Sequence, residues 1–148
     1  MKHNNELPEA DFFLVYLRGH LAEHRFPQHD DSKFIESRAD EAYDTFVTSR
    51  LEGRSVPVAR ELAMCTLLGG LYVSRYDILY SVVEENLWLR LPEEYWPAFA
   101  EHLLGLKHVN DILDRYEVNG DFLSRESHTP MLTELLGAIT EILDGYGL

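Results

Sequence analysis

The sequence predicts an all-α protein, a single-domain multihelical bundle or orthogonal array of five to seven helices with a central apolar helix. Apolar residues recur every three or four positions through most of the chain, as on one face of a helix. Most of these stretches also begin and end with residues that start and stop helices. Almost nothing in the sequence is typical of a β-strand. The length of 148 residues, 45% of them hydrophobic, suits one globular domain over residues 1–148.

The first helix is expected from Asp11 to His24, because Pro27 disfavours helix in the residue before it. The second follows the N-cap candidates Asp30-Asp-Ser32 and ends at Gly53, which suits the left-handed position after a helix. The apolar stripes of these two helices are Ala10, Phe13, Leu14, Leu17 and Leu21, and then Ile35, Ala39, Ala42 and Phe46.

The third helix is expected to begin at Ser55-Val-Pro57, with the proline near the first turn, where its missing N–H costs nothing. Between Leu62 and Leu71 the chain is apolar nearly all round, which is typical of a helix surrounded by others. Cys65, the only cysteine, lies in this stretch and is expected to behave as a small hydrophobic residue. Gly69-Gly70 is expected to break or kink the helix.

The fourth helix is expected after Ser74-Arg-Tyr-Asp77, a variant capping box with Asp77 at the third helical position. The next helical region opens at Leu91-Pro92 and contains Pro97 and Gly105, so one bent helix and two shorter helices both fit.

The last helix is expected to start at Thr129-Pro130 and to end at Gly145. Before it, Asn119-Gly120 predicts a turn and residues 124–128 a surface loop. Helices of this length are marginal in water, so each apolar stripe must pack against another. One stripe facing a second copy would make a homodimer, and the sequence leaves that alternative open.

The formal net charge is −13, from 26 Asp+Glu against 13 Lys+Arg. Such a field repels phosphates, so direct binding to nucleic acid or to an anionic membrane is not expected. An acidic surface attracts basic partners or imitates a phosphate backbone, although solubility alone is the simpler interpretation. The N-terminus has no signal-peptide pattern and no apolar run approaches the roughly 20 residues of a membrane span, so a cytoplasmic protein is expected.

Several short strings, in order along nearly the whole chain, resemble a family of small helical proteins catalogued as a domain of unknown function and typical of Bacteroidales. The strings are Tyr16-Leu-Arg18, Phe34-Ile-Glu-Ser-Arg-Ala-Asp-Glu-Ala42, Arg50-Leu-Glu-Gly53, Glu61-Leu-Ala-Met64, Ser74-Arg-Tyr-Asp77 and Tyr146-Gly-Leu148. The resemblance implies an all-α fold, a bacterial cytoplasmic setting and frequent association with conjugative or integrated mobile elements. It implies no catalytic residue.

One motif suggests metal chemistry. His20-Leu-Ala-Glu-His24 fits the H-x-x-E-H pattern of zinc peptidases, with two histidine ligands, Glu23 as base and a distant glutamate such as Glu101 to complete the ligand set. Helical geometry favours a structural interpretation, because Glu23 falls well outside the apolar stripe that His24 lies near. His24 also ends its helix, where it would interact favourably with the last carbonyls.

Two other groups are candidates for binding. The aromatic residues Trp88, Tyr95, Trp96 and Phe99 would line a groove for a peptide or flat ligand, although aromatics at helical spacing more often form core. Arg18, Arg38, Arg50 and Arg75 would recognise carboxylates or phosphates, but ion pairs between helices explain them more simply.

The sequence therefore favours a non-enzymatic acidic accessory protein without a cofactor. Its expected partner is another protein, one encoded with it on a mobile element in the setting that the resemblance implies. The alternatives are a DNA-mimic inhibitor of a basic nucleic-acid-binding protein and a zinc peptidase that uses His20, Glu23 and His24.

Overall fold

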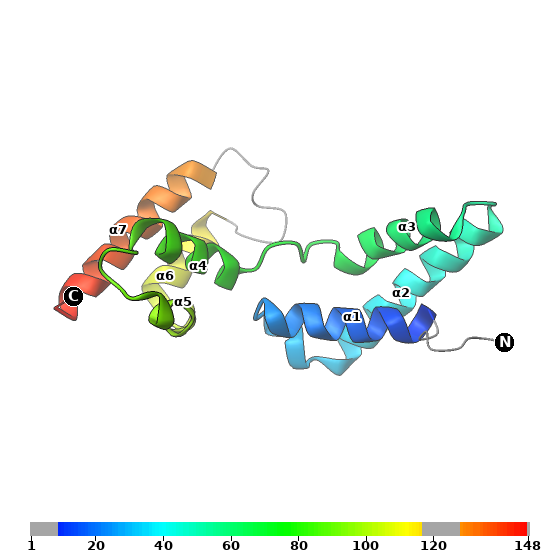
Figure 1. Cartoon of the computed structure of the whole chain (residues 1–148), viewed down its shortest axis with the longest axis horizontal. Helices are drawn as coiled ribbons and strands as arrows, with labels where there is room; N and C mark the ends of the chain where they lie inside the picture. Colours follow the sequence, from blue (N-terminus) through cyan, green and yellow to red (C-terminus); the bar gives the residue numbers. More distant parts are fainter. Residues whose placement is uncertain (1–8, 117–127, 148) are drawn as a thin grey trace. The chain divides into compact units, whose positions relative to one another are not determined.

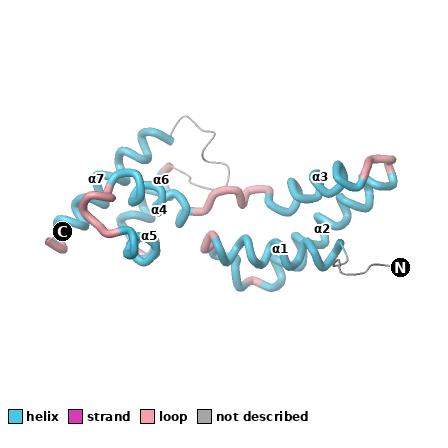
Figure 2. The backbone as a smooth tube through the Cα atoms, in the orientation of Figure 1, coloured by secondary structure: helices cyan, strands magenta, loops and turns pink. Residues whose placement is uncertain are grey.

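The computed structural model describes residues 9–116 and 128–147, and within these ranges every regular element is helical (Figures 1 and 2). The all-α prediction is confirmed. The elements are α1 (Glu9–Glu23), η1 (Pro27–Asp30), α2 (Ser32–Leu51), α3 (Val56–Leu68), α4 (Arg75–Asn86), η2 (Glu93–Tyr95), α5 (Trp96–Leu104), α6 (Lys107–Arg115) and α7 (His128–Gly145), where η denotes a 3-10 helix.

The chain divides into two compact units, an N-terminal unit of residues 1–69 and a C-terminal unit of residues 70–148. Gly70 stands at the boundary with a φ of +76°, in the left-handed region that favours glycine. The break expected at Gly69-Gly70 is therefore where one unit ends and the next begins. That the chain is a single domain stays a prediction, tested by whether the two units unfold together.

In the N-terminal unit, α1 packs on the hairpin that α2 and α3 form (Figure 1). Phe13, Leu17 and Leu21 follow one another at four-residue spacing on α1 and are fully buried. The α2–α3 hairpin also buries four alanines, whose short side chains allow helices to pack closely. These buried alanines are Ala39, Ala42, Ala59 and Ala63.

The helix ends in this unit match the signals in the sequence. The Asp31 side chain accepts a hydrogen bond from the backbone N–H of Phe34 at 3.1 Å, which caps α2. The Ser55 side chain caps α3 through the N–H of Val58, and Gly53 has a φ of +94° in the connecting turn. Each of these features needs only residues within one turn of the helix end.

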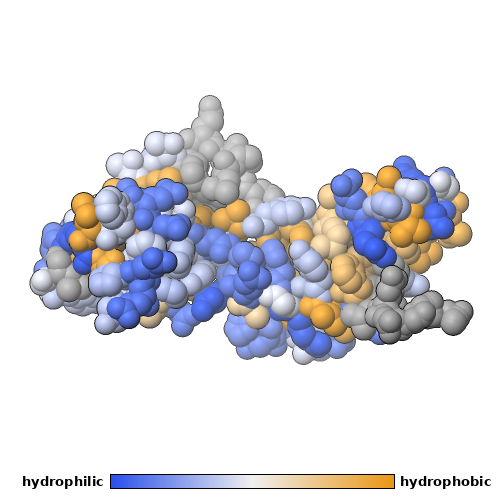
Figure 3. All heavy atoms as spheres, in the orientation of Figure 1, coloured by the Kyte–Doolittle hydropathy of each residue, from blue (hydrophilic) through white to orange (hydrophobic). Residues whose placement is uncertain are grey.

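The surroundings of α3 differ from the expectation of an apolar helix buried all round. Ala59, Ala63 and Leu67 are buried, but Leu62 is 38% exposed and Cys65 is exposed. Ala59, Ala63 and Leu67 follow one another at four-residue spacing and share one face of α3, whereas Leu62 and Cys65 lie off that face. In the view of Figure 3, hydrophobic residues show at the surface over α3.

In the C-terminal unit, α4 packs against α5 and α7, and α6 packs against α7. Their buried apolar side chains form one core, whose fully buried members include Leu79, Val83, Leu103, Val109, Leu113, Met131, Leu135, Ile139 and Leu143. The capping box at the start of α4 is present as predicted: the Ser74 hydroxyl accepts from the N–H of Asp77, and the Asp77 carboxylate accepts from the N–H of Ser74.

The region between Pro92 and Tyr116 forms two helices rather than one bent helix. α5 ends at Leu104 and α6 begins at Lys107, and the connecting Leu106 is extended, with φ −88° and ψ 132°. The last helix begins at His128, one residue before the expected N-cap. The expected turn at Asn119-Gly120, most of the expected loop at 124–128 and the final Leu148 lie outside the described residues.

Candidate functional site

The two histidines of the H-x-x-E-H motif lie side by side at the end of α1. Their ring centroids are 4.6 Å apart, and both rings contact Phe26, at 5.7 Å from His20 and 6.4 Å from His24. Phe26 is buried, so the two imidazoles pack over the edge of the N-terminal core, whereas Glu23 is exposed. The histidines therefore take part in an aromatic cluster that closes this end of the unit.

Glu101, the glutamate considered as a further ligand, lies on α5 in the C-terminal unit. Among the residues that the structure describes, no group of three or more His, Cys, Asp or Glu side chains is placed to hold a metal ion. The zinc site stays a prediction, and metal analysis of the purified protein tests it.

The four arginines singled out from the sequence have different surroundings. Arg38 donates from one guanidinium nitrogen to the carbonyls of Leu67 and Gly69, at 3.1 and 2.8 Å. Arg38 therefore supplies hydrogen bonds to backbone carbonyls at the C-terminal end of α3. The expectation from the sequence was an ion pair between helices instead. Arg75 makes the expected kind of pair, to Asp114 of α6 at 2.6 Å. Arg50 donates to the backbone carbonyl of Arg54, while Arg18 is exposed.

The aromatic group is divided between surface and core. Trp96 is half-buried and donates its indole N–H to the carbonyl of Leu91 at 2.9 Å, and its ring meets Tyr80 edge-on. Trp88, in contrast, is 60% exposed. Tyr95 and Phe99 line a pocket of about 450 Å³, so two of the four residues lie where a groove was expected.

This pocket, called here the α5 pocket, lies between one face of η2 and α5 and the loop before them. Its lining residues are Arg90, Leu91, Pro92, Tyr95, Ala98, Phe99 and His102. Two of the lining residues, Arg90 and His102, have basic side chains, and the described lining contains no carboxylate.

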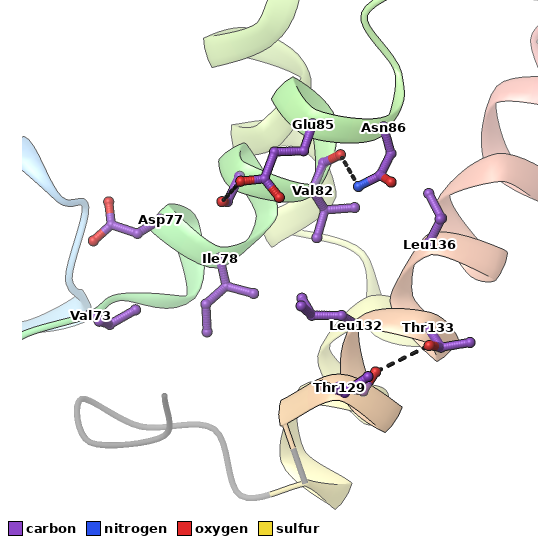
Figure 4. A pocket seen from close by; sticks show the side chains of 11 residues that line it. Val73, Asp77, Ile78, Val82, Glu85, Asn86, Thr129, Leu132, Thr133 and Leu136 are labelled. Atoms are coloured by element: carbon purple, nitrogen blue, oxygen red, sulfur yellow. Dashed lines mark hydrogen bonds between the residues drawn. The ribbon is translucent and has the colours of Figure 1, made fainter. Parts of the chain in front are cut away.

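A second hollow, the α4–α7 groove, lies between α4 and the first half of α7 and has a volume of about 530 Å³ (Figure 4). Ile78 and Val82 of α4 point toward Leu132 of α7 across its floor. The lining residues are Val73, Asp77, Ile78, Ser81, Val82, Glu85, Asn86, Thr129, Leu132, Thr133 and Leu136. Sequence reasoning missed this groove, although Ile78 and Val82, like Leu132 and Leu136, show the i, i+4 spacing of a helix face.

The walls of the α4–α7 groove are polar and are held by bonds within their own helices. Ser81 donates to the Glu85 carboxylate at 3.5 Å, Asn86 to the carbonyl of Val82 at 3.0 Å, and Thr133 to the carbonyl of Thr129 at 3.1 Å. Asp77 and Glu85 are acidic, and no basic side chain is among the described lining residues. The two hollows of the C-terminal unit thus carry opposite charge.

Charged contacts fix α7, one wall of the groove, against α6. Tyr116 donates its hydroxyl to Glu134 at 2.7 Å, and Arg115 pairs with the same carboxylate at 2.6 Å. The hydrogen bond from Tyr116, followed by that from Arg115, holds the pKa of Glu134 below its usual value. The same bond raises the pKa of Tyr116, because ionising the phenol beside a carboxylate would remove the donor and place two negative charges together.

None of the helices in the described ranges is both long and apolar enough to cross a bilayer. No curated protein matches the chain. Among solved structures, the crystal structure of protein PG0816 from Porphyromonas gingivalis is similar, with 30% sequence identity, 93% of each chain covered and a TM-score of 0.86.

Porphyromonas is one of the Bacteroidales, which agrees with the resemblance seen in the sequence, whereas the association with mobile elements stays a prediction. The match to a family extends over residues 4–148, and the chain therefore belongs to the family described as a domain of unknown function (DUF1896).

Proposed function

We propose that this chain is a non-enzymatic acidic accessory protein and that it binds another protein through the α4–α7 groove. The observation that supports the proposal is the groove itself, which has a volume of about 530 Å³, an apolar floor and acidic side chains on one wall. Its partner is an amphipathic helix with basic residues along one edge. The resemblance adds the expectation that the partner is encoded with this chain on a mobile element.

The shape of the groove favours a helix as the occupant. Two antiparallel or parallel helices that flank a hydrophobic floor are a common receptor for a third amphipathic helix, whose apolar residues at i, i+3, i+4 and i+7 fill the floor. Leu132 and Leu136 are half-buried, so their remaining surface is available to such residues, while Ile78 and Val82 on α4 are buried.

The charges select a basic partner. Asp77 and Glu85 lie eight residues apart on α4, which at 1.5 Å per residue separates them by about 12 Å along the helix axis. Two Lys or Arg residues seven or eight positions apart on a bound helix match that separation. The net charge of −13 would in addition speed the approach of such a partner.

The test is capture from native lysate with four proteins: wild type, Glu85→Lys, Leu136→Glu and Glu84→Lys. Glu84 and Glu85 are exposed neighbours on α4, and of the two only Glu85 lines the groove, so Glu84→Lys is a control with the same charge change. We expect wild type and Glu84→Lys to recover the same partner, and the other two to lose it. Recovery should also fall as salt rises.

Equal recovery by all four proteins would overturn the assignment to the groove. Equal weakening by Glu84→Lys and Glu85→Lys, with Leu136→Glu unaffected, would instead favour the DNA-mimic alternative, in which charge over the whole surface carries the binding. A chain that captures no partner and remains an inert monomer would overturn the proposed function.

A further inference from the structure

The α5 pocket is built on one helix face. Tyr95, Ala98, Phe99 and His102 follow each other at i, i+3, i+4 and i+7, so their side chains leave η2 and α5 in one direction. Ala98 contributes only a methyl group between larger neighbours, which leaves a hollow in the middle of this face. The loop residues Leu91 and Pro92 close the opposite side.

The loop side of the pocket is held in place without a ligand. Pro92 has a fixed, extended backbone, with φ −59° and ψ 146°. The indole N–H of Trp96 holds the carbonyl of Leu91 at 2.9 Å, which ties the loop to α5. A ligand that enters therefore does not have to order this wall, and the entropic cost of binding is reduced.

The two basic groups of the pocket are also positioned. Arg90 donates from Nη2 to Asp144 at 2.7 Å, and His102 lies 2.8 Å from the Tyr146 hydroxyl with its ring stacked on Phe99. A guanidinium presents five N–H donors in one plane, so Arg90 can keep its bond to Asp144 while it meets a second carboxylate.

The charge of the pocket is the reverse of that of the chain. The protein has twice as many acidic residues as Lys+Arg, yet the described pocket lining contains Arg90 and His102 and no Asp or Glu. An apolar cavity with a few convergent polar groups is typical of a small-molecule site, and a charged hydrogen bond from Arg is strongest to a carboxylate.

We infer that the α5 pocket binds a small apolar carboxylate, its aromatic or branched body between Pro92, Tyr95 and Phe99 and its carboxylate toward Arg90 and His102. The site is distinct from the α4–α7 groove, and each can be tested without the other. A pocket of about 450 Å³ is within the usual range for such ligands.

The test uses 4-phenylbutyrate as the probe and 4-phenylbutyramide as its uncharged analogue, added to the full chain and followed by two-dimensional NMR. The protein has two tryptophans, so two indole N–H signals are expected. Because Trp96 bonds to Leu91 of the pocket wall, we expect 4-phenylbutyrate to shift its signal in a saturable way. The signal that disappears in the variant Trp88→Phe belongs to the exposed Trp88, and the remaining signal belongs to Trp96.

Three variants assign the ligand contacts. Ala98→Leu fills the hollow and should weaken 4-phenylbutyrate about tenfold or more, whereas Ala22→Leu, another exposed helical alanine, should not. Arg90→Met should weaken the acid about tenfold but leave the amide unchanged, with the exposed Arg18→Met as control. Asp144→Asn removes the ion pair but keeps Arg90, so binding of the acid should be retained.

A saturable shift of the Trp96 signal that is lost in Ala98→Leu and Arg90→Met supports the inference. Equal affinity for the acid and the amide would overturn the carboxylate assignment. The pocket assignment is overturned if millimolar 4-phenylbutyrate moves no signal, or if Ala98→Leu binds it as the wild type does.

Discussion

Replacing Arg38 by methionine removes the group that completes the end of α3 while it keeps most of the apolar stem. The last carbonyls of a helix lack partners within the helix, and Arg38 supplies two hydrogen bonds there, to Leu67 and Gly69. Its guanidinium also lies 5.0 Å from the centre of the Phe34 ring. The side chain is 23% exposed, so water replaces only part of what is lost.

A hydrogen bond with a charged partner contributes about 1.5–3 kcal/mol, and a partly exposed cation–π contact about 0.5–1 kcal/mol. Because one nitrogen makes both bonds and water reaches part of the site, we expect Arg38→Met to lower the free energy of unfolding by about 2 kcal/mol. Arg18→Met is the matched control on an exposed helix position and should change it by less than about 0.5 kcal/mol.

Urea unfolding followed by far-ultraviolet circular dichroism measures both variants. The tryptophans, at positions 88 and 96, lie in the C-terminal unit, so their fluorescence follows that unit alone. If the units unfold independently, Arg38→Met shifts the circular dichroism and leaves the fluorescence transition in place. A coincident shift of both signals would show one cooperative domain. Arg38→Met as stable as Arg18→Met would refute the capping role.

Three further predictions concern pH, backbone and metal. Because the pKa of Glu134 is lower in the folded protein than in the unfolded chain, its carboxylate stabilises the fold at pH values above the unfolded pKa. This stabilisation is lost as the pH falls through the folded pKa, so Glu134→Gln should make stability depend less on pH in the acid range. The pKa of Tyr116 is higher in the folded protein, so its stabilising contribution is lost as the pH rises through the folded pKa. Tyr116→Phe should therefore make stability depend less on pH in the alkaline range. Gly70→Ala, at φ +76°, should cost about 1 kcal/mol or more in thermal unfolding, whereas Gly137→Ala, in open space within α7, should stabilise by about 0.5–1 kcal/mol. Zinc in the purified protein should be substoichiometric and unchanged by His20→Ala; one tightly bound ion lost in that variant would restore the peptidase alternative.

The two proposals can be tested separately, because the α4–α7 groove and the α5 pocket share no lining residue. Glu85→Lys alters the groove, while Ala98→Leu alters the α5 pocket, and neither residue lines the other hollow. Loss of protein capture in the first variant and of 4-phenylbutyrate binding in the second are therefore independent results.

Local features were readable in the sequence because the interactions behind them span only one helical turn. Asp31, Ser55 and Ser74 each bond a backbone N–H three residues ahead, and Gly53 needs only its own left-handed backbone. Tyr95 and Phe99 could likewise be placed near a hollow from their spacing beside Pro92. These signals determined the all-α fold and most helix ends, whereas a ligand site at Tyr95 and Phe99 stays a prediction.

Only the tertiary structure decided which faces of those helices meet. It buried Ala59, Ala63 and Leu67 of α3 and exposed Leu62 and Cys65. It also brought Val82 of α4 across from Leu132 of α7 to form a groove. The hydrophobic effect is not directional, so an apolar stripe in the sequence predicts that the helix face is buried but not which helix covers it. That choice depends on the fit of side-chain volumes between helices far apart in the chain.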